Sequence, residues 1–236
     1  MNIQTATDPG TATLIRIRLN LRSPDVHRDL ARPGSLHKTI MLLAPEGLGE
    51  NPRQQAGLLF RLEHATAQMP PTLLIQSRLP PDLTRLPATY GTVETRDLTP
   101  VLTALTTGRR IRYRITANAS TRRRVTDRDP FFDPDTKPRH TDVPLQGDDA
   151  LAWWQRKATH AGLDLHSAAL TPVPASRHPI TRQHDNDRQP DVFRPALTRY
   201  DGQATITDPD QLRHALLTGI GRGKPYGAGL LSLAPA

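Results

Sequence analysis

Two segments of this chain alternate between apolar and polar residues. Residues 13–19 read TLIRIRL and residues 110–117 read RIRYRITA, so in each segment the apolar side chains share one face and arginines occupy the other. A period of two is typical of a β-strand with one face buried and the other exposed. Strands of this kind belong to antiparallel sheets that are covered on one side. The chain is therefore expected to have an α+β fold built on antiparallel sheets.

The segments between these two strands predict one complete folding unit. They comprise a helix that begins after a cap at Ser35 and carries Leu36 and Ile40, strands at 57–63 and 72–77, and a short helix at 98–105. The resulting order is strand, helix, strand, strand, helix, strand, which indicates a ferredoxin-like unit. We assign it to residues 1–118.

The second half of the chain repeats this architecture without repeating the sequence. Residues 119–140 are polar, charged and rich in proline, which predicts a loop and linker. The predicted elements that follow are a helix from Asp148 to Gly162, a strand at 163–171, a hairpin around Asp201-Gly202, a helix between Asp208 and Gly219, and a strand at 229–235. We therefore expect a second ferredoxin-like (RRM-like) domain over residues 141–236.

The charge of the chain favours a nucleic acid as partner. Lysine and arginine total 31 against 23 acidic residues, which gives a net charge of +8 and a pI of about 10.5. Cations that displace counterions from a polyanion gain binding free energy. Aromatic residues make up only 4% of the chain, so we expect contacts to phosphate, sugar and duplex shape rather than base stacking. A basic surface that serves solubility alone is the alternative.

The composition also limits the compartment and the chemistry. Cysteine is absent, which excludes disulfides and thiolate metal sites and suits the cytoplasm. The sequence has no apolar run of membrane-spanning length and no signal-peptide pattern at its start. The spacing of His, Asp and Glu matches neither a zinc motif nor an EF-hand, so we expect neither a metal nor another cofactor.

A glycine-rich segment at residues 219–229, GIGRGKPYGAG, is the densest motif in the chain. It fails as a phosphate-binding P-loop because Lys224 is followed by Pro225, and it lacks the third glycine of a dinucleotide-binding turn. It leaves a backbone that can approach a ligand closely, with Arg222 and Lys224 as cations for an RNA phosphate. The alternative is a flexible turn into the last strand. The glycines concerned are Gly219, Gly221, Gly223, Gly227 and Gly229.

Among nine histidines, His37 has the most distinctive position. It is predicted to lie in the first turn of a helix, beside Lys38. Both the positive end of the helix and the lysine should lower its pKa and keep the ring neutral near pH 7. A neutral imidazole can accept a proton from an RNA 2′-hydroxyl. An ordinary surface histidine is the alternative.

Taken together, these segments resemble the CasE-type CRISPR RNA-processing endoribonucleases. The resemblance runs almost from end to end and is most specific at the C-terminus. The matching segments are RDL at 28–30, LHK at 36–38, GLLFRLE at 57–63, LLIQS at 73–77, RYRITAN at 112–118, VPL at 143–145, LAWWQRK at 151–157 and GIGRGKPYGAGLLSLAP at 219–235.

The resemblance implies two tandem ferredoxin-like domains and metal-independent cleavage of a CRISPR repeat hairpin. It places a catalytic role on His37: the RNA 2′-hydroxyl attacks its own 3′ phosphate and leaves a 2′,3′-cyclic phosphate and a 5′-hydroxyl. It further implies the mature guide RNA and other subunits of a multisubunit interference complex as partners, with no membrane involved. From charge and loop position we add Lys38 and five arginines as RNA-binding candidates: Arg122, Arg123, Arg124, Arg177 and Arg182.

This chain departs from the family at one position near the histidine. A tyrosine often stands three residues before it, and here that residue is Gly34. Ser35 is one candidate to replace the tyrosine. The departure keeps open a non-catalytic subunit that binds RNA hairpins. A general nucleic-acid chaperone, binding without hairpin preference, is a third possibility.

Overall fold

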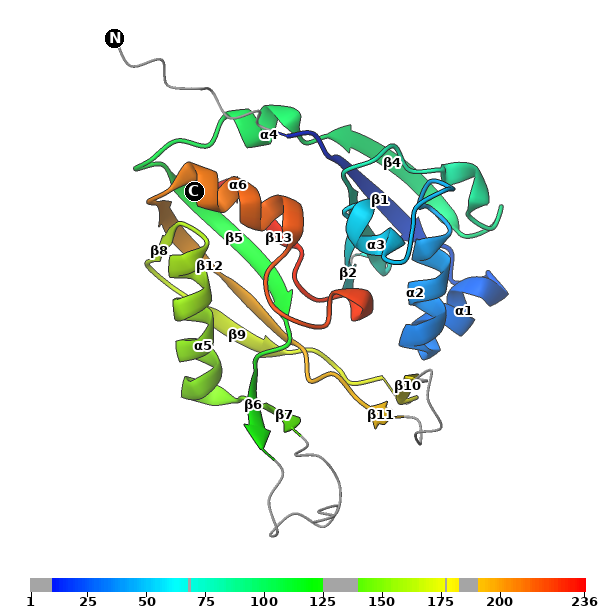
Figure 1. The fold of residues 1–236 in the computed structure, drawn as a ribbon. Coiled ribbons are helices and arrows are strands. Elements are labelled where there is room, and N and C mark those ends of the chain that lie inside the picture. The colour runs from blue at the N-terminus through cyan, green and yellow to red at the C-terminus, as the bar shows by residue number, and fades with distance from the viewer. Residues whose placement is uncertain (1–9, 68, 125–139, 177, 183–190) are drawn as a thin grey trace.

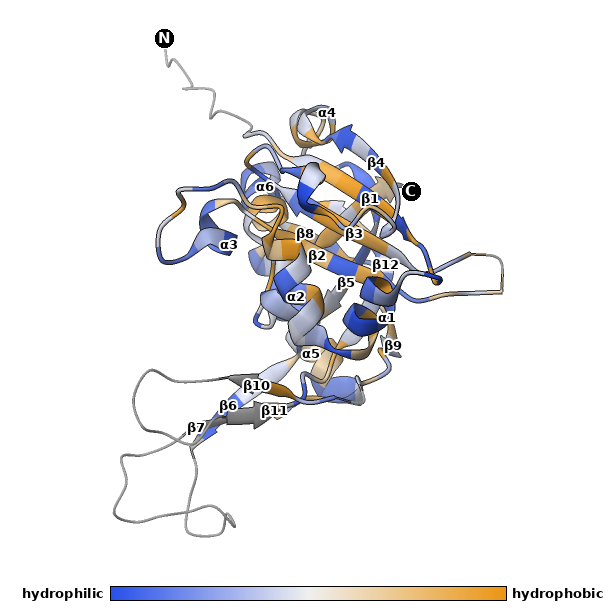
Figure 2. Cartoon of the chain, turned by 90° about the vertical axis from the view of Figure 1, so that its right-hand side faces the viewer, coloured by the Kyte–Doolittle hydropathy of each residue, from blue (hydrophilic) through white to orange (hydrophobic). Residues whose placement is uncertain are grey.

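The computed structural model describes residues 10–67, 69–124, 140–176, 178–182 and 191–236 (Figure 1). Its core is two antiparallel sheets, each with its own hydrophobic cluster. Figure 2 shows apolar residues gathered along β1 (Thr13–Leu19) and β3 (Thr72–Ser77), and hydrophilic ones on α1 (Pro24–Ala31). In the part of the chain that is described, no helix combines the length and apolarity needed to cross a membrane.

The first sheet has the strand order β2-β3-β1-β4. Its alternating strands bury one face against the helices that follow β1, where Ile15 and Ile17 share a cluster with Leu36 and Ile40 of α2. The remaining elements of this unit are α2 (Pro33–Met41), α3 (Pro52–Gln55), β2 (Leu59–Glu63), the 3-10 turn η1 (Leu83–Arg85) and β4 (Gly91–Asp97).

The second sheet has the order β13-β5-β12-β8, and β9 also pairs with β12. Helices α5 and α6 share its core, where Trp154 packs among Tyr113 and Tyr200. The elements are β5 (Arg110–Ala117), α5 (Gly147–His160), β8 (Leu163–Leu165), β9 (Ala169–Pro172), β12 (Thr198–Ile206), α6 (Pro209–Thr218), η2 (Lys224–Tyr226) and β13 (Leu231–Pro235).

Both sheets follow one topological rule. In each, the first strand in the chain lies between the third and the fourth, and the second lies at the edge beyond the third. This arrangement is the ferredoxin-like fold, so the predicted fold class is confirmed. The first unit has η1, and no full helix, between its third and fourth strands.

One predicted strand joins the other sheet. Residues 110–117 form β5, but β5 pairs with β12 and β13 of the second sheet rather than closing the first. The fourth strand of the first sheet is β4, which the sequence did not predict. The physical reason is that Ile111, Tyr113 and Ile115 fit the larger cluster around Trp154. We therefore place the domain boundary between residues 97 and 110 rather than after 118.

Two local predictions are also wrong. Asp201-Gly202 is not a hairpin turn but lies in the middle of β12, paired with Arg114 and Tyr113 of β5. Ser35 does not cap α2, because the helix begins at Pro33. The predicted cap at Asp208 is confirmed, since its side chain accepts bonds from the N–H groups of residues 210 and 211.

Short elements occupy the predicted loops and linkers. The ends of the 119–140 segment pair with each other as β6 (Ser120–Arg124) and β7 (His140–Pro144). The pair β10 (Ile180–Arg182) and β11 (Asp191–Phe193) lies between β9 and β12 in the chain, and α4 (Thr99–Thr103) connects the two sheets.

The two sheets are joined by polar side chains that are themselves buried. Arg61 of β2 donates from Nη1 to the carbonyl oxygens of Leu230 (2.9 Å) and Arg114 (3.2 Å), and its Nε donates to Glu63. Gln76 of β3 donates from Nε2 to a carbonyl oxygen at the end of α6 (2.8 Å). These bonds fix the sheets relative to each other, because an unpaired buried donor is costly.

Candidate functional site

His37 lies on α2 with its ring partly buried against the rest of the protein. Because α2 begins at Pro33, His37 is in the second turn and not, as predicted, in the first. Burial lowers the pKa of His37, and the positive charge of Arg53 lowers it further. The predicted direction of the shift is confirmed, but its causes are burial and Arg53 rather than the helix start. Lys38 is exposed, and adjacent residues of a helix do not face each other.

One ring nitrogen of His37 has unusual surroundings. Its Nδ1 is buried and has no hydrogen-bond partner among the described residues. An imidazolium would place an N–H group at this atom with no acceptor, and such a buried donor is costly. The neutral ring is therefore favoured, in agreement with the lowered pKa.

The glycine-rich segment forms the wall next to His37. The ring of Tyr226 lies 6.3 Å from the imidazole, centroid to centroid, at an interplanar angle of 58°. The 3-10 turn η2, which contains Tyr226, contacts both α2 and β2. Two motifs that the sequence places almost 200 residues apart therefore meet at one site.

The glycines of this segment pack the backbone tightly against the protein. A Cβ at Gly219 would lie 2.7 Å from Leu59 Cδ2, and one at Gly229 would lie 2.8 Å from the oxygen of Ile220. The contacts made at these positions are with the protein itself, so the glycines shape the loop that carries Lys224. All five predicted glycines have φ between 75° and 92°: Gly219, Gly221, Gly223, Gly227 and Gly229.

The two predicted cations of the segment point to different pockets. Lys224 is partly buried and lines a pocket of about 600 Å³ together with Arg53 and Arg78. Arg222 is exposed, forms an ion pair with Asp142 of β7, and lines a separate pocket of about 540 Å³. Lys224 therefore shares its pocket with Arg53, the residue whose charge acts on His37, and Arg222 does not.

The pocket at Arg222 is part of a basic surface separate from the Lys224 pocket, and we call it the second basic surface. Arg122 of β6 lines it beside Arg156 and Lys157 of α5. Arg123, also on β6, is exposed. Arg124 and Arg182 hold strand positions in β6 and β10, but their side chains, like the whole of Arg177, lie outside the described residues.

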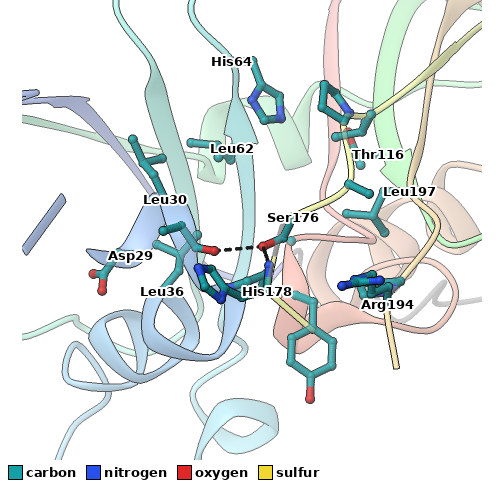
Figure 3. A pocket seen from close by; sticks show the side chains of 18 of the residues that line it. Asp29, Leu30, Leu36, Leu62, His64, Thr116, Ser176, His178, Arg194 and Leu197 are labelled. Carbon is teal, nitrogen blue, oxygen red and sulfur yellow. Dashed lines mark hydrogen bonds between the residues drawn. The ribbon is translucent and has the colours of Figure 1, made fainter. Parts of the chain in front are cut away.

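A third pocket, of about 560 Å³, is lined in part by residues of α1 and of the first turn of α2 (Figure 3). Leu36 and Tyr226 line it, and the ring of Tyr226 is the one that lies near the imidazole of His37. His64 and His178 face it from opposite sides, and the Oγ of Ser176 donates a 2.9 Å hydrogen bond to the carbonyl oxygen of Ala31 across it. Burial lowers the pKa of His64.

Sequence reasoning missed two residues next to His37. Tyr226 is the single aromatic residue of the glycine-rich segment, and that fact could have singled it out. Arg53 lies in a helix of only four residues, which has no apolar periodicity to predict it. Its proximity to His37 depends on the fold alone.

The fold and site together define a class: two ferredoxin-like units with a neutral histidine facing a glycine-rich loop. Residues 14–235 match the model of the family described as CRISPR associated protein. The chain is 28% identical to the CRISPR-associated endoribonuclease Cse3 of Thermus thermophilus, over 94% of this chain and 99% of that protein.

Solved structures agree with this match. Thermus thermophilus Cse3, bound to an RNA representing a pre-cleavage complex, superposes with a TM-score of 0.70 at 26% identity, covering 95% of this chain and all of that one. A chain of a CRISPR RNA-guided surveillance complex, pre-nicking, reaches a TM-score of 0.64 at 35% identity, with 95% and 100% coverage. The chain belongs to the CRISPR-associated protein family.

Proposed function

We propose that this protein is a metal-independent endoribonuclease that binds CRISPR repeat stem-loops and cleaves precursor CRISPR RNA in the cytoplasm. The observation that carries the proposal is His37, whose lowered pKa favours the neutral ring, held against the glycine-rich segment. The match to Cse3 over nearly the whole of both chains supports it.

The chemistry follows from the position of His37. The imidazole takes the proton of the 2′-hydroxyl, the oxygen forms a bond to the adjacent phosphorus, and the bond from phosphorus to the 5′-oxygen breaks. The 5′-oxygen takes a proton from water, and a 2′,3′-cyclic phosphate remains on the other product. A positioned general base supplies about 10²–10⁴ in rate. Lys224 stabilises the charge that develops on the phosphate.

Hairpin binding is assigned to the second basic surface. The cations there, Arg122, Arg156, Lys157 and Arg222, would contact phosphates of the stem. Arg123 and Arg124 on the same strand extend this surface, and Arg177 and Arg182 belong to the proposed RNA contacts on charge alone. After cleavage the protein keeps the mature guide RNA and binds other subunits of an interference complex. One of its structural matches is a chain of a CRISPR RNA-guided surveillance complex.

Product analysis tests the proposed reaction. Repeat RNA incubated with the protein in EDTA should be cut at one position, and an unrelated hairpin of equal length should stay intact. The upstream product should end in a cyclic phosphate, and the downstream product should carry a 5′-hydroxyl that a kinase can label directly. Cleavage that needs added Mg²⁺, or a 5′-phosphate on the product, would contradict the mechanism.

A non-catalytic hairpin-binding subunit is the second candidate, and Gly34 is the observation that favours it. Apart from its chain neighbours and the backbone of its own helix, no described atom lies within 4 Å of where a Cβ of Gly34 would be, so no described side chain fills that place instead of the family tyrosine. Under this alternative the wild-type protein binds the repeat hairpin tightly and never cuts it. Binding that unrelated duplex RNA displaces equally well would instead indicate a general chaperone.

A further inference from the structure

Among the described residues, five of the six arginines that are buried or partly buried pair with a carboxylate. Buried Arg61 pairs with Glu63, Arg114 pairs with Asp201, and exposed Arg85 pairs with both Glu46 and Asp82. A half-buried cation without such a partner is therefore unusual here, because loss of hydration has to be compensated.

Arg53 and Lys224 are two cations of this unusual kind. Both are partly buried, and among the described residues neither forms an ion pair with a carboxylate. Nη1 of Arg53 donates to the carbonyl oxygen of Leu58 (3.1 Å), which fixes the guanidinium and leaves its other N–H groups available. The two cations line the same pocket of about 600 Å³.

The proximity of these like charges is unfavourable in the free protein. Burial lowers the pKa of both groups, and the charge of Arg53 lowers the pKa of Lys224 further. Arg53 acts on His37 in the same way, so the three groups form one electrostatic cluster. An anion bound between the two cations would remove this repulsion and supply the missing counter-charge.

The pocket is suited to a phosphate group because polar and cationic side chains line it. Its other lining groups include the polar side chains of Asn51, Gln54, Gln55 and Thr218. A guanidinium can donate two parallel hydrogen bonds to phosphate oxygens, whereas lysine acts as a point charge. Arg53 and Lys224 together thus offer both kinds of contact in one pocket.

We propose that Arg53 is a catalytic residue that, together with Lys224, binds the non-bridging oxygens of the scissile phosphodiester beside His37. The assignment rests on the endoribonuclease function proposed above. When the 2′-oxygen attacks, the phosphorus carries five oxygens and extra negative charge, and Arg53 stabilises that charge. Removing one such preorganised donor costs about 10²-fold in rate.

The test compares Arg53→Met with Arg85→Met in single-turnover cleavage of repeat RNA. Both changes remove one positive charge, but Arg85 lies outside the pocket and pairs with carboxylates. We expect Arg53→Met to cut about 10²-fold more slowly and Arg85→Met to cut at the wild-type rate. Arg53→Lys keeps the positive charge but loses the two parallel N–H donors of the guanidinium, so its cleavage rate should lie between those of the two variants. Thermal unfolding checks that each variant is folded. If Arg53→Met does not fold, Arg53→Lys is compared with wild type instead.

The pH dependence separates a catalytic from a structural role. Arg53 lowers the pKa of His37, so its loss should move the acidic limb of the rate profile to higher pH. A merely structural residue would leave that limb in place. Wild-type-like rates and an unmoved limb for folded Arg53→Met would overturn the proposal while leaving the endoribonuclease function intact. A wild-type protein that never cuts repeat RNA would overturn both.

Discussion

At the scale of single residues, the protonation state of His37 decides the pH dependence of cleavage. The imidazole works as a base only when neutral, and burial with Arg53 lowers its pKa below the ordinary 6.5. The rate should therefore rise with pH, with its midpoint below 6.5, and be level near neutrality. A single-turnover profile from pH 4.5 to 8 measures this, and a midpoint above 6.5 would contradict the assignment.

Tyr226 should matter through its ring. The ring lies at 6.3 Å from the imidazole and limits the orientations of His37. Contacts of this kind are worth about 0.5–1.5 kcal/mol, so Tyr226→Ala should slow cleavage by roughly tenfold while hairpin affinity is unchanged. Tyr226→Phe keeps the ring and should cut like wild type. If Tyr226→Phe is as slow as Tyr226→Ala, the hydroxyl group and not the ring is what acts.

At the scale of elements, the glycine-rich segment depends on backbone conformations that residues other than glycine adopt poorly. Gly229 and Gly108 both have positive φ, but a Cβ at Gly229 would lie 2.8 Å from a backbone oxygen, whereas none lies within 4 Å at Gly108. Gly108→Ala should cost about 1 kcal/mol in unfolding free energy, and Gly229→Ala more than about 2 kcal/mol. Urea denaturation measures both, and equal losses would contradict the packing role of Gly229.

The sequence predicted those elements whose apolar residues repeat with a clear period. β1 and β5 alternate over most of their length and were found, but β4 has one large apolar residue, Val93, which is itself 37% exposed. β12 was split because Asp-Gly usually marks a turn. In the fold, Asp201 pairs with Arg114, and Gly202 leaves room where a Cβ would lie 2.0 Å from the oxygen of Ser167.

The site was predictable only in part for a related reason. His37 and the glycine-rich segment stand out in the sequence, but nothing local says that they meet. Arg53 approaches His37 only because the sheet positions α3 beside the C-terminal loop. Long-range contacts of this kind leave no periodic signal in a single sequence.

At the scale of the whole molecule, Arg61 holds the two sheets together. It is buried and donates to Leu230, just before β13, and to Ser232 of β13 while it pairs with Glu63. Arg61→Met would leave buried acceptors and a carboxylate without a partner, so it should lower unfolding free energy by about 3 kcal/mol or more. Arg16→Met, at a more exposed ion pair within the first sheet, should change stability little. Equal effects in urea denaturation would contradict the bridging role.

The central claim is that His37 carries the cleavage chemistry on this two-unit scaffold. The most direct measurement is single-turnover cleavage of repeat RNA in EDTA by wild type and His37→Ala, with affinity for an RNA that is 2′-deoxy at the cut site measured alongside. We predict that His37→Ala cuts at least about 10²-fold more slowly and binds equally well. Cleavage by His37→Ala at the wild-type rate would contradict the account.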